Sequence, residues 1–122
     1  MAMAELKQKV NADVVDLSVF RTMTEGDVET EKKLISLFIN QSLKNIEVLK
    51  KNVLANGYNH YWTENAHMLK GAAAAIGAEK LRKLSYDAQE FDGISDGRQI
   101  LLERIQDEYS KVELALAQEG LV

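Results

Sequence analysis

The chain has 122 residues, of which 46% are hydrophobic, contains no cysteine and no proline, and carries a formal net charge of −4. Its length suits one domain with its own core, and the lack of cysteine excludes disulfides, cysteine-based zinc sites and cysteine nucleophiles. The negative charge disfavours non-specific nucleic-acid binding, which depends on Lys and Arg neutralising phosphates. No apolar run approaches the roughly 18 residues of a membrane span and no signal-peptide core is present, so we expect a soluble cytoplasmic protein.

Five helical segments are predicted from residues with high helix propensity and from the turn signals between them. The first covers about residues 13–24. The second begins after the candidate N-cap Asp27 and reaches about residue 55. The remaining three cover about residues 59–76, 78–91 and 97–118, and glycines mark the turns that separate the segments.

Apolar residues recur at helical spacing in every segment. In the third segment they occur at steps of four, three, four and three, which places them on one face of a helix. In chain order the apolar positions are Val14, Leu17 and Phe20; Ile35, Phe38, Ile46, Leu49 and Val53; Trp62, Ala66, Leu69, Ala73 and Ile76; Leu81, Leu84, Ala88 and Phe91; and Leu101, Ile105, Tyr109, Val112 and Leu116. Four long amphipathic helices joined by short turns predict an all-α fold, an antiparallel up-down-up-down four-helix bundle with a short additional N-terminal helix capping one end.

His67, in the third segment, lies away from the apolar stripe, on a helix face that has few long side chains. At about 100° per residue it lies roughly 140° from the centre of that stripe, and Gly71 lies roughly 180° from it. Ala74 falls at roughly 120° and Lys70 on the flank at roughly 80°. An exposed helix face usually carries long polar side chains, and glycine costs about 1 kcal/mol relative to alanine inside a helix. The bare surface therefore indicates close approach by a partner, and Lys70 at i+3 can bring a cation to an anionic group on the imidazole.

The segment around this histidine resembles a known family signature. It reads Ala66-His67-x-x-Lys70-Gly71 and continues to Gly77, which is similar to the A-H-x-x-K-G-x-x-x-x-x-G signature of histidine-containing phosphotransfer (HPt) domains. The predicted helix order agrees with the family as well, although serine often follows the K-G pair where this chain has alanine. The resemblance predicts a single domain over residues 13–122. It leaves residues 1–12 as an N-terminal extension, whose opening residues we expect to be in part an expression artefact.

The resemblance implies a function and a set of site residues. His67 accepts a phosphoryl group on Nε2 from a phospho-aspartate of one receiver domain and passes it to an aspartate of another. Lys70 offsets the charge, Gly71 leaves room for the partner, and Gln89 hydrogen-bonds the imidazole. Such a domain has no ATP-dependent kinase activity and no cofactor of its own, whereas Mg²⁺ is expected on the partner receiver domain.

The expected partners are response-regulator receiver domains and a hybrid sensor histidine kinase, with the chain a monomer that binds neither nucleic acid nor membranes. The sequence leaves open whether the chain is a free relay protein or a domain of such a kinase. It also leaves open whether Gln89, on the flank of its apolar stripe, reaches the neighbouring helix or is an ordinary boundary residue. Residues 67–83 carry a net charge of +3, which suits an acidic partner and equally a solvated helix surface. The charged residues are Lys70, Lys80, Arg82 and Lys83 against Glu79.

Two other functions compete with phosphotransfer. A metal site formed by His60, Glu64 and His67 is disfavoured, because seven residues span about 10.5 Å along a helix. That separation is too large for both histidines to reach one ion at bonds of about 2.0 to 2.2 Å, so we predict no metal site. A helical interaction module would use the same docking face without phosphate chemistry, and phosphoryl transfer from a receiver domain distinguishes the two.

Overall fold

The computed structural model describes residues 2–3 and 11–122, and over these ranges its regular secondary structure is entirely helical. The predicted all-α class is therefore confirmed. Most of the predicted N-terminal extension, residues 1–12, lies outside the described residues. Within the described ranges, no helix is both long enough and apolar enough to cross a membrane.

The described chain forms a helical turn at residues 11–14 and then a series of helices. These are α2 (Ser18–Met23), α3 (Val28–Lys51), α4 (His60–Ile76), α5 (Glu79–Gln89) and α6 (Ser95–Gln118). The second helix was predicted to end at about residue 55, which is later than its end in the structure. α3 ends at Lys51 because Asn52 closes it: its backbone N–H donates to Leu49 C=O and its side-chain amide donates to Val48 C=O at 2.9 Å.

The prediction of one continuous helix over residues 13–24 was wrong. Residues 15–17 separate the helical turn at 11–14 from α2, which begins only at Ser18. The backbone N–H of Asp16 donates to Gly77 C=O at 3.0 Å, and its carboxylate accepts the N–H of Ser18 at 3.1 Å. The chain leaves the helical path because Asp16 pairs with the far end of α4, a partner that is distant in the sequence.

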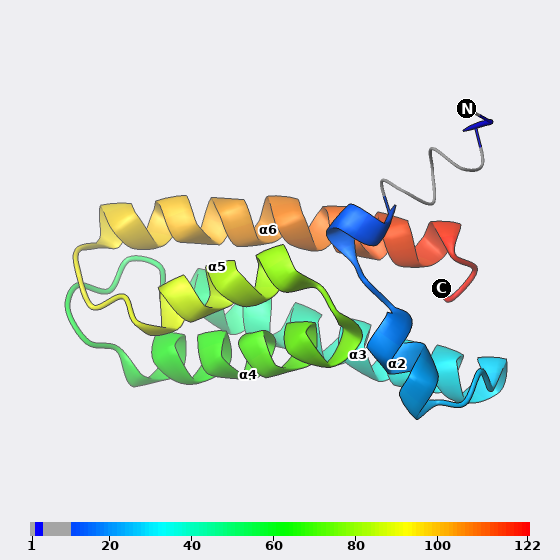
Figure 1. Ribbon diagram of the computed structural model, residues 1–122. Coiled ribbons are helices and arrows are strands. Elements are labelled where there is room, and N and C mark those ends of the chain that lie inside the picture. The colour runs from blue at the N-terminus through cyan, green and yellow to red at the C-terminus, as the bar shows by residue number, and fades with distance from the viewer. Residues whose placement is uncertain (1, 4–10) are drawn as a thin grey trace.

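The four long helices α3 to α6 lie side by side along one axis, and their connections alternate between the two ends (Figure 1). α4 packs against both α3 and α5, and α6 packs against both α5 and α3. The short helix α2 contacts α4 near the end of the bundle where α4 stops. α4, which carries the histidine, is thus held by neighbours on both flanks.

The core contains most of the predicted apolar positions. In α4, Trp62, Ala66, Leu69 and Ala73 have no exposed surface, and Ile76 is 3% exposed. Other predicted positions are only partly buried, namely Val14, Val53, Leu84, Phe91 and Leu101. In α6 the buried residue is Leu102, one position after the predicted Leu101.

The buried stripe of α6 begins one turn before Leu102 with Arg98, which is fully buried although it is charged. Its guanidinium donates to Ala55 C=O at 2.6 Å, to Gly93 C=O at 3.1 Å and to Gly57 C=O. Burial lowers the pKa of Arg98, and these carbonyls supply the partners that a buried cation needs. Counted from Arg98, the buried stripe of α6 runs at steps of four and three, and the prediction missed only its first two positions, Arg98 and Leu102.

Candidate functional site

α4 turns His67 outward because its opposite face is buried. The helix begins after Asn59, whose side-chain oxygen accepts the N–H of Trp62 at 2.9 Å, an N-cap contact that sets the start of the helix. From that start His67, Gly71 and Ala74 are all exposed. The predicted direction of the histidine is confirmed, since the face assignment depends only on helical geometry and on the apolar stripe.

The imidazole of His67 meets the side chain of Gln89, the last residue of α5. The distance between His67 Nδ1 and Gln89 Oε1 is 3.0 Å. The amide nitrogen of Gln89 lies 3.4 Å from Glu90 Oε1, so it has an acceptor of its own, and Oε1 is the atom that faces the ring. Because Oε1 can only accept, this contact favours Nδ1 as the donor, which leaves Nε2 unprotonated whenever the ring is neutral.

Lys70 is half-buried and lies against an aromatic ring rather than standing free in solvent. Its Nζ is 5.4 Å from the centroid of the Tyr86 ring of α5. An aromatic face attracts an ammonium group, so Tyr86 holds the Lys70 ammonium on the surface of α4 and α5 that carries His67. The sequence analysis did not anticipate Tyr86, which lies one turn before Gln89 on the same helix.

The neighbouring Ser85 does not reach α4. It is fully buried, and its hydroxyl donates to Leu81 C=O of its own helix at 2.7 Å. Of these two polar residues of α5, Ser85 and Gln89, only Gln89 meets the histidine.

The two glycines of the motif differ in what surrounds them. A Cβ at Gly71 would meet nothing within 4 Å. Gly77 ends α4 in the left-handed region, with φ of 80°, and the following N–H of Ala78 donates to Ala73 C=O at 2.9 Å. A Cβ at Gly77 would lie 1.9 Å from the carbonyl oxygen of Asp16, so the close approach of residues 15–17 to the end of α4 requires glycine there.

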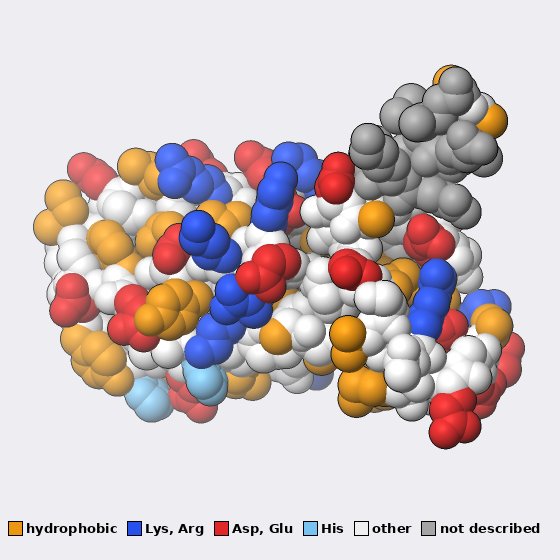
Figure 2. Space-filling model, viewed as in Figure 1, with side chains coloured by type: hydrophobic (Ala, Val, Ile, Leu, Met, Phe, Trp, Pro, Cys, Tyr) orange, Lys and Arg blue, Asp and Glu red, His pale blue; other side chains and the backbone are white. Residues whose placement is uncertain are grey.

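The cations predicted near the histidine are not all available. Arg82 Nε donates to Glu79 Oε2 at 2.8 Å, and this hydrogen bond holds the pKa of the Glu79 carboxyl below its ordinary value. The two remaining lysines of α5 line a hollow together with two carboxylates that lie outside residues 67–83, and these four residues are Lys80, Lys83, Asp87 and Glu108. The sequence count of +3 therefore overstates the positive field. Figure 2 shows blue side chains beside one of the pale blue histidines, with red ones interspersed.

The geometry does not bring the three residues of the competing metal site together. His60 Nε2 lies 2.9 Å from Glu64 Oε2, an exposed pair one turn apart on α4. His67 instead contacts Gln89. Among the residues that the structure describes, no group of three or more Asp, Glu or His side chains converges as metal ligands would.

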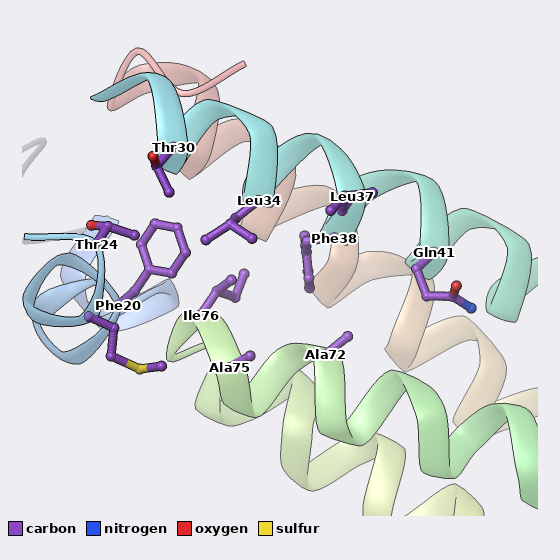
Figure 3. A pocket seen from close by; sticks show the side chains of 11 residues that line it. Phe20, Thr24, Thr30, Leu34, Leu37, Phe38, Gln41, Ala72, Ala75 and Ile76 are labelled. Carbon is purple, nitrogen blue, oxygen red and sulfur yellow. The ribbon is translucent and has the colours of Figure 1, made fainter. Parts of the chain in front are cut away.

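An apolar groove of about 550 Å³ lies between α2, α3 and the C-terminal half of α4 (Figure 3). Its walls include side chains that are exposed despite being apolar: Met23 is 76% exposed, Leu37 64% and Leu34 42%. Ala72 and Ala75 form the α4 side of the groove, and Ala75 stands about 12 Å along the helix from His67. The sequence analysis missed the groove, because three helices build it together.

Comparison with known protein families shows the family of the chain. A model of the Hpt domain family matches residues 33–118, more than half of the chain, so the chain belongs to the Hpt domain family. Hpt domains are phosphocarriers rather than kinases, act in histidine phosphotransfer in two-component systems, and interact with receiver domains and kinases. No curated protein and no solved structure matches the chain.

Proposed function

We propose that the chain is a phosphorelay intermediate in which His67 accepts a phosphoryl group from the phospho-aspartate of one receiver domain and passes it to an aspartate of another. The observation that carries the proposal is the exposed imidazole of His67 with its Nδ1 3.0 Å from Gln89 Oε1. The family match supports phosphotransfer as the class of function. In this proposal the chain is an antiparallel up-down-up-down bundle that acts as a cytoplasmic monomer, and a hybrid sensor histidine kinase carries the donor receiver.

In this reaction the phosphocarrier supplies the nucleophile and two groups that stabilise charge. The lone pair of His67 Nε2 attacks phosphorus, the bond between phosphorus and the aspartyl oxygen breaks, and the aspartate leaves as a carboxylate. Gln89 Oε1 accepts from Nδ1–H, which keeps Nε2 free for attack and stabilises the positive charge that the ring gains. The ammonium of Lys70 offsets charge on the transferred group. Mg²⁺ belongs to the receiver in this scheme, and the chain contributes no cofactor.

Docking of the receiver involves more than the histidine. The partner must bring its aspartate within bonding reach of Nε2, and Gly71 and Ala74 keep the surface low where it approaches. The exposed apolar side chains of the groove extend the same side of α4, and such a patch favours a protein partner over water. We infer that the receiver covers the outer face of α4 together with this groove.

The test is to incubate the protein with a phosphorylated receiver domain carrying labelled phosphate. We expect label that is acid-labile and alkali-stable, as phosphohistidine is, and its complete loss in His67→Gln. His60→Gln is the matched control, because the sequence has two histidines and His60 is also exposed on α4. Label that survives in His67→Gln would overturn the site assignment.

A second candidate function is an interaction module that binds partners without phosphate chemistry. The groove favours this candidate, since none of its lining residues is His67 and its binding would not need the imidazole. Receivers that bind wild type and His67→Gln equally, lose binding in Leu37→Glu and never transfer label would establish the module. Transfer from any receiver to His67 would exclude it as the sole function.

A further inference from the structure

Trp62 makes a buried hydrogen bond that joins α4 to the last turn of α5. Its indole N–H donates to Ala88 C=O at 2.7 Å, and the side chain has no exposed surface. Ala88 C=O also accepts the N–H of Phe91 at 3.2 Å, where the helix ends. This carbonyl belongs to the turn that a helix leaves without its full set of internal partners, so the indole supplies a partner from another helix.

Ala88 is the residue directly before Gln89, and Gln89 is the last residue of α5. The final turn of a helix frays unless something outside the helix holds it. The side chain of Gln89 itself is weakly held, because its other polar contact is the exposed one to Glu90 at 3.4 Å. The position of Gln89 Oε1 therefore depends on where the backbone at the end of α5 lies.

The indole ring also lies close to a buried cation. The guanidinium carbon of Arg98 lies 5.4 Å from the centroid of the Trp62 ring and 5.6 Å from that of the Phe91 ring. Arg98 is fixed by carbonyls of both loops at this end of the bundle, as described above. A Trp62 ring that is restrained in this way fixes the position of the backbone at the end of α5. That backbone carries Gln89, which meets the imidazole of His67, five residues after Trp62 on α4.

We propose that Trp62 is a positioning residue for phosphotransfer: its indole N–H holds the end of α5 so that Gln89 Oε1 stays on His67 Nδ1 and Nε2 stays unprotonated. Trp62 acts through Gln89 and touches no reacting atom. The proposal rests on the proposed phosphotransfer function for its kinetic consequence. Its structural consequence, the preference of His67 for the Nδ1–H tautomer, does not depend on any partner.

The test removes the N–H and keeps the ring. Trp62→Phe does this approximately, and replacing Trp62 with 3-benzothienylalanine keeps both fused rings while deleting the donor. Trp62 is the only tryptophan in the sequence, so biosynthetic replacement alters this site alone. We expect phosphoryl acceptance from a phosphorylated receiver to fall about fivefold, the rate change that corresponds to the loss of one ordinary hydrogen bond.

The second readout is the nitrogen NMR spectrum of the His67 ring at a pH where the ring is neutral. We expect the substituted protein to shift from the Nδ1–H tautomer toward the Nε2–H tautomer. Combined with Gln89→Ala, the Trp62 substitution should cause no further loss of rate, because its effect passes through Gln89. Ser85→Ala is the matched control, since it deletes a buried hydrogen bond of the same length on α5 that stays within that helix.

The outcomes separate this inference from the proposed function. An unchanged tautomer population in the benzothienyl protein, an equal shift in Ser85→Ala, or rate losses that add to those of Gln89→Ala would each overturn the role of Trp62. A wild-type protein that accepts no phosphoryl group from any receiver would instead overturn the proposed function, while the NMR comparison would still decide whether Trp62 positions Gln89.

Discussion

The two glycines of the histidine motif, Gly71 and Gly77, lie six residues apart in the sequence and meet opposite surroundings. At Gly77 the backbone has φ of 80°, and a Cβ would lie 1.9 Å from the carbonyl oxygen of Asp16. Gly71 lies inside α4, is exposed, and a Cβ there would meet nothing within 4 Å. The described structure thus supplies a reason for glycine at one position and none at the other.

The difference separates a glycine that the fold requires from a glycine that only the proposed function explains. Glycine inside a helix is less favourable than alanine by about 1 kcal/mol, and nothing within the described chain offsets that loss at Gly71. The proposed function supplies a reason for glycine there, because the receiver must come close to His67. Glycine at position 77 needs no partner to explain it, because the close approach of residues 15–17 already requires it.

The largest expected effect is that of Gly77→Ala on stability. The left-handed backbone and the displacement of Asp16 together should lower the free energy of unfolding by about 3 kcal/mol. Urea denaturation followed by circular dichroism measures it. Gly120→Ala is the matched control, because Gly120 has φ of 77° but a Cβ there would meet nothing within 4 Å. Equal losses in the two variants would show that the Asp16 contact is unimportant.

Gly71→Gln should leave folding intact and slow phosphoryl transfer about tenfold, equivalent to about 1.4 kcal/mol, because the longer side chain obstructs the approach of the receiver. Rapid-quench kinetics with a phosphorylated receiver give the rate. Ser110→Gln, at an exposed position of α6, controls for the added side chain itself. Transfer as fast as in the wild type would refute the steric role of Gly71.

Gly71→Ala should raise the free energy of unfolding by about 1 kcal/mol, the difference in helix propensity between the two residues. The methyl group is small, so transfer should slow less than in Gly71→Gln. The same denaturation measurement used for Gly77→Ala detects the gain. Failure to stabilise would mean that glycine is not costly at this position and would weaken the contrast between the two glycines.

Lys70→Ala is expected to have the smallest effect on the fold, a loss below about 1 kcal/mol, since it removes one contact between an ammonium and the partly exposed Tyr86 ring. Phosphoryl acceptance should fall a few-fold because the charge beside His67 is lost. Tyr86→Leu removes the ring and keeps the charge, so it reports the structural part alone. A large drop in melting temperature for Lys70→Ala would assign Lys70 to the fold instead of the site.

The face of α4 that carries the histidine could be predicted from the sequence because it depends on local periodicity. Once the buried stripe of α4 is recognised, the outward direction of His67 and Gly71 follows from the helical turn alone. The flank position of Gln89 was likewise readable, but its contact with His67 was not. That contact depends on how far α5 slides and rotates against α4, which the sequence of either helix does not specify.

Other features escaped prediction because their causes are distant in the chain. A charged residue such as Arg98 is expected outside the core, and the carbonyls that stabilise it belong to Ala55, Gly57 and Gly93 on two separate loops. The break before α2 arises from the pairing of Asp16 with Gly77. The residues that neighbour Arg98 or Asp16 in the sequence do not indicate either set of hydrogen bonds.

The sequence by itself determined the helical class, the buried face of α4 and the histidine on its outer face, since helix formation and amphipathicity act over one or two turns. Tertiary structure decided which atoms meet: Gln89 Oε1 at His67 Nδ1, Tyr86 beneath Lys70, and the Trp62 indole at the end of α5. These contacts require the relative placement of α4 and α5 to within a hydrogen-bond length. Close packing of the core side chains, rather than local propensity, supplies that accuracy.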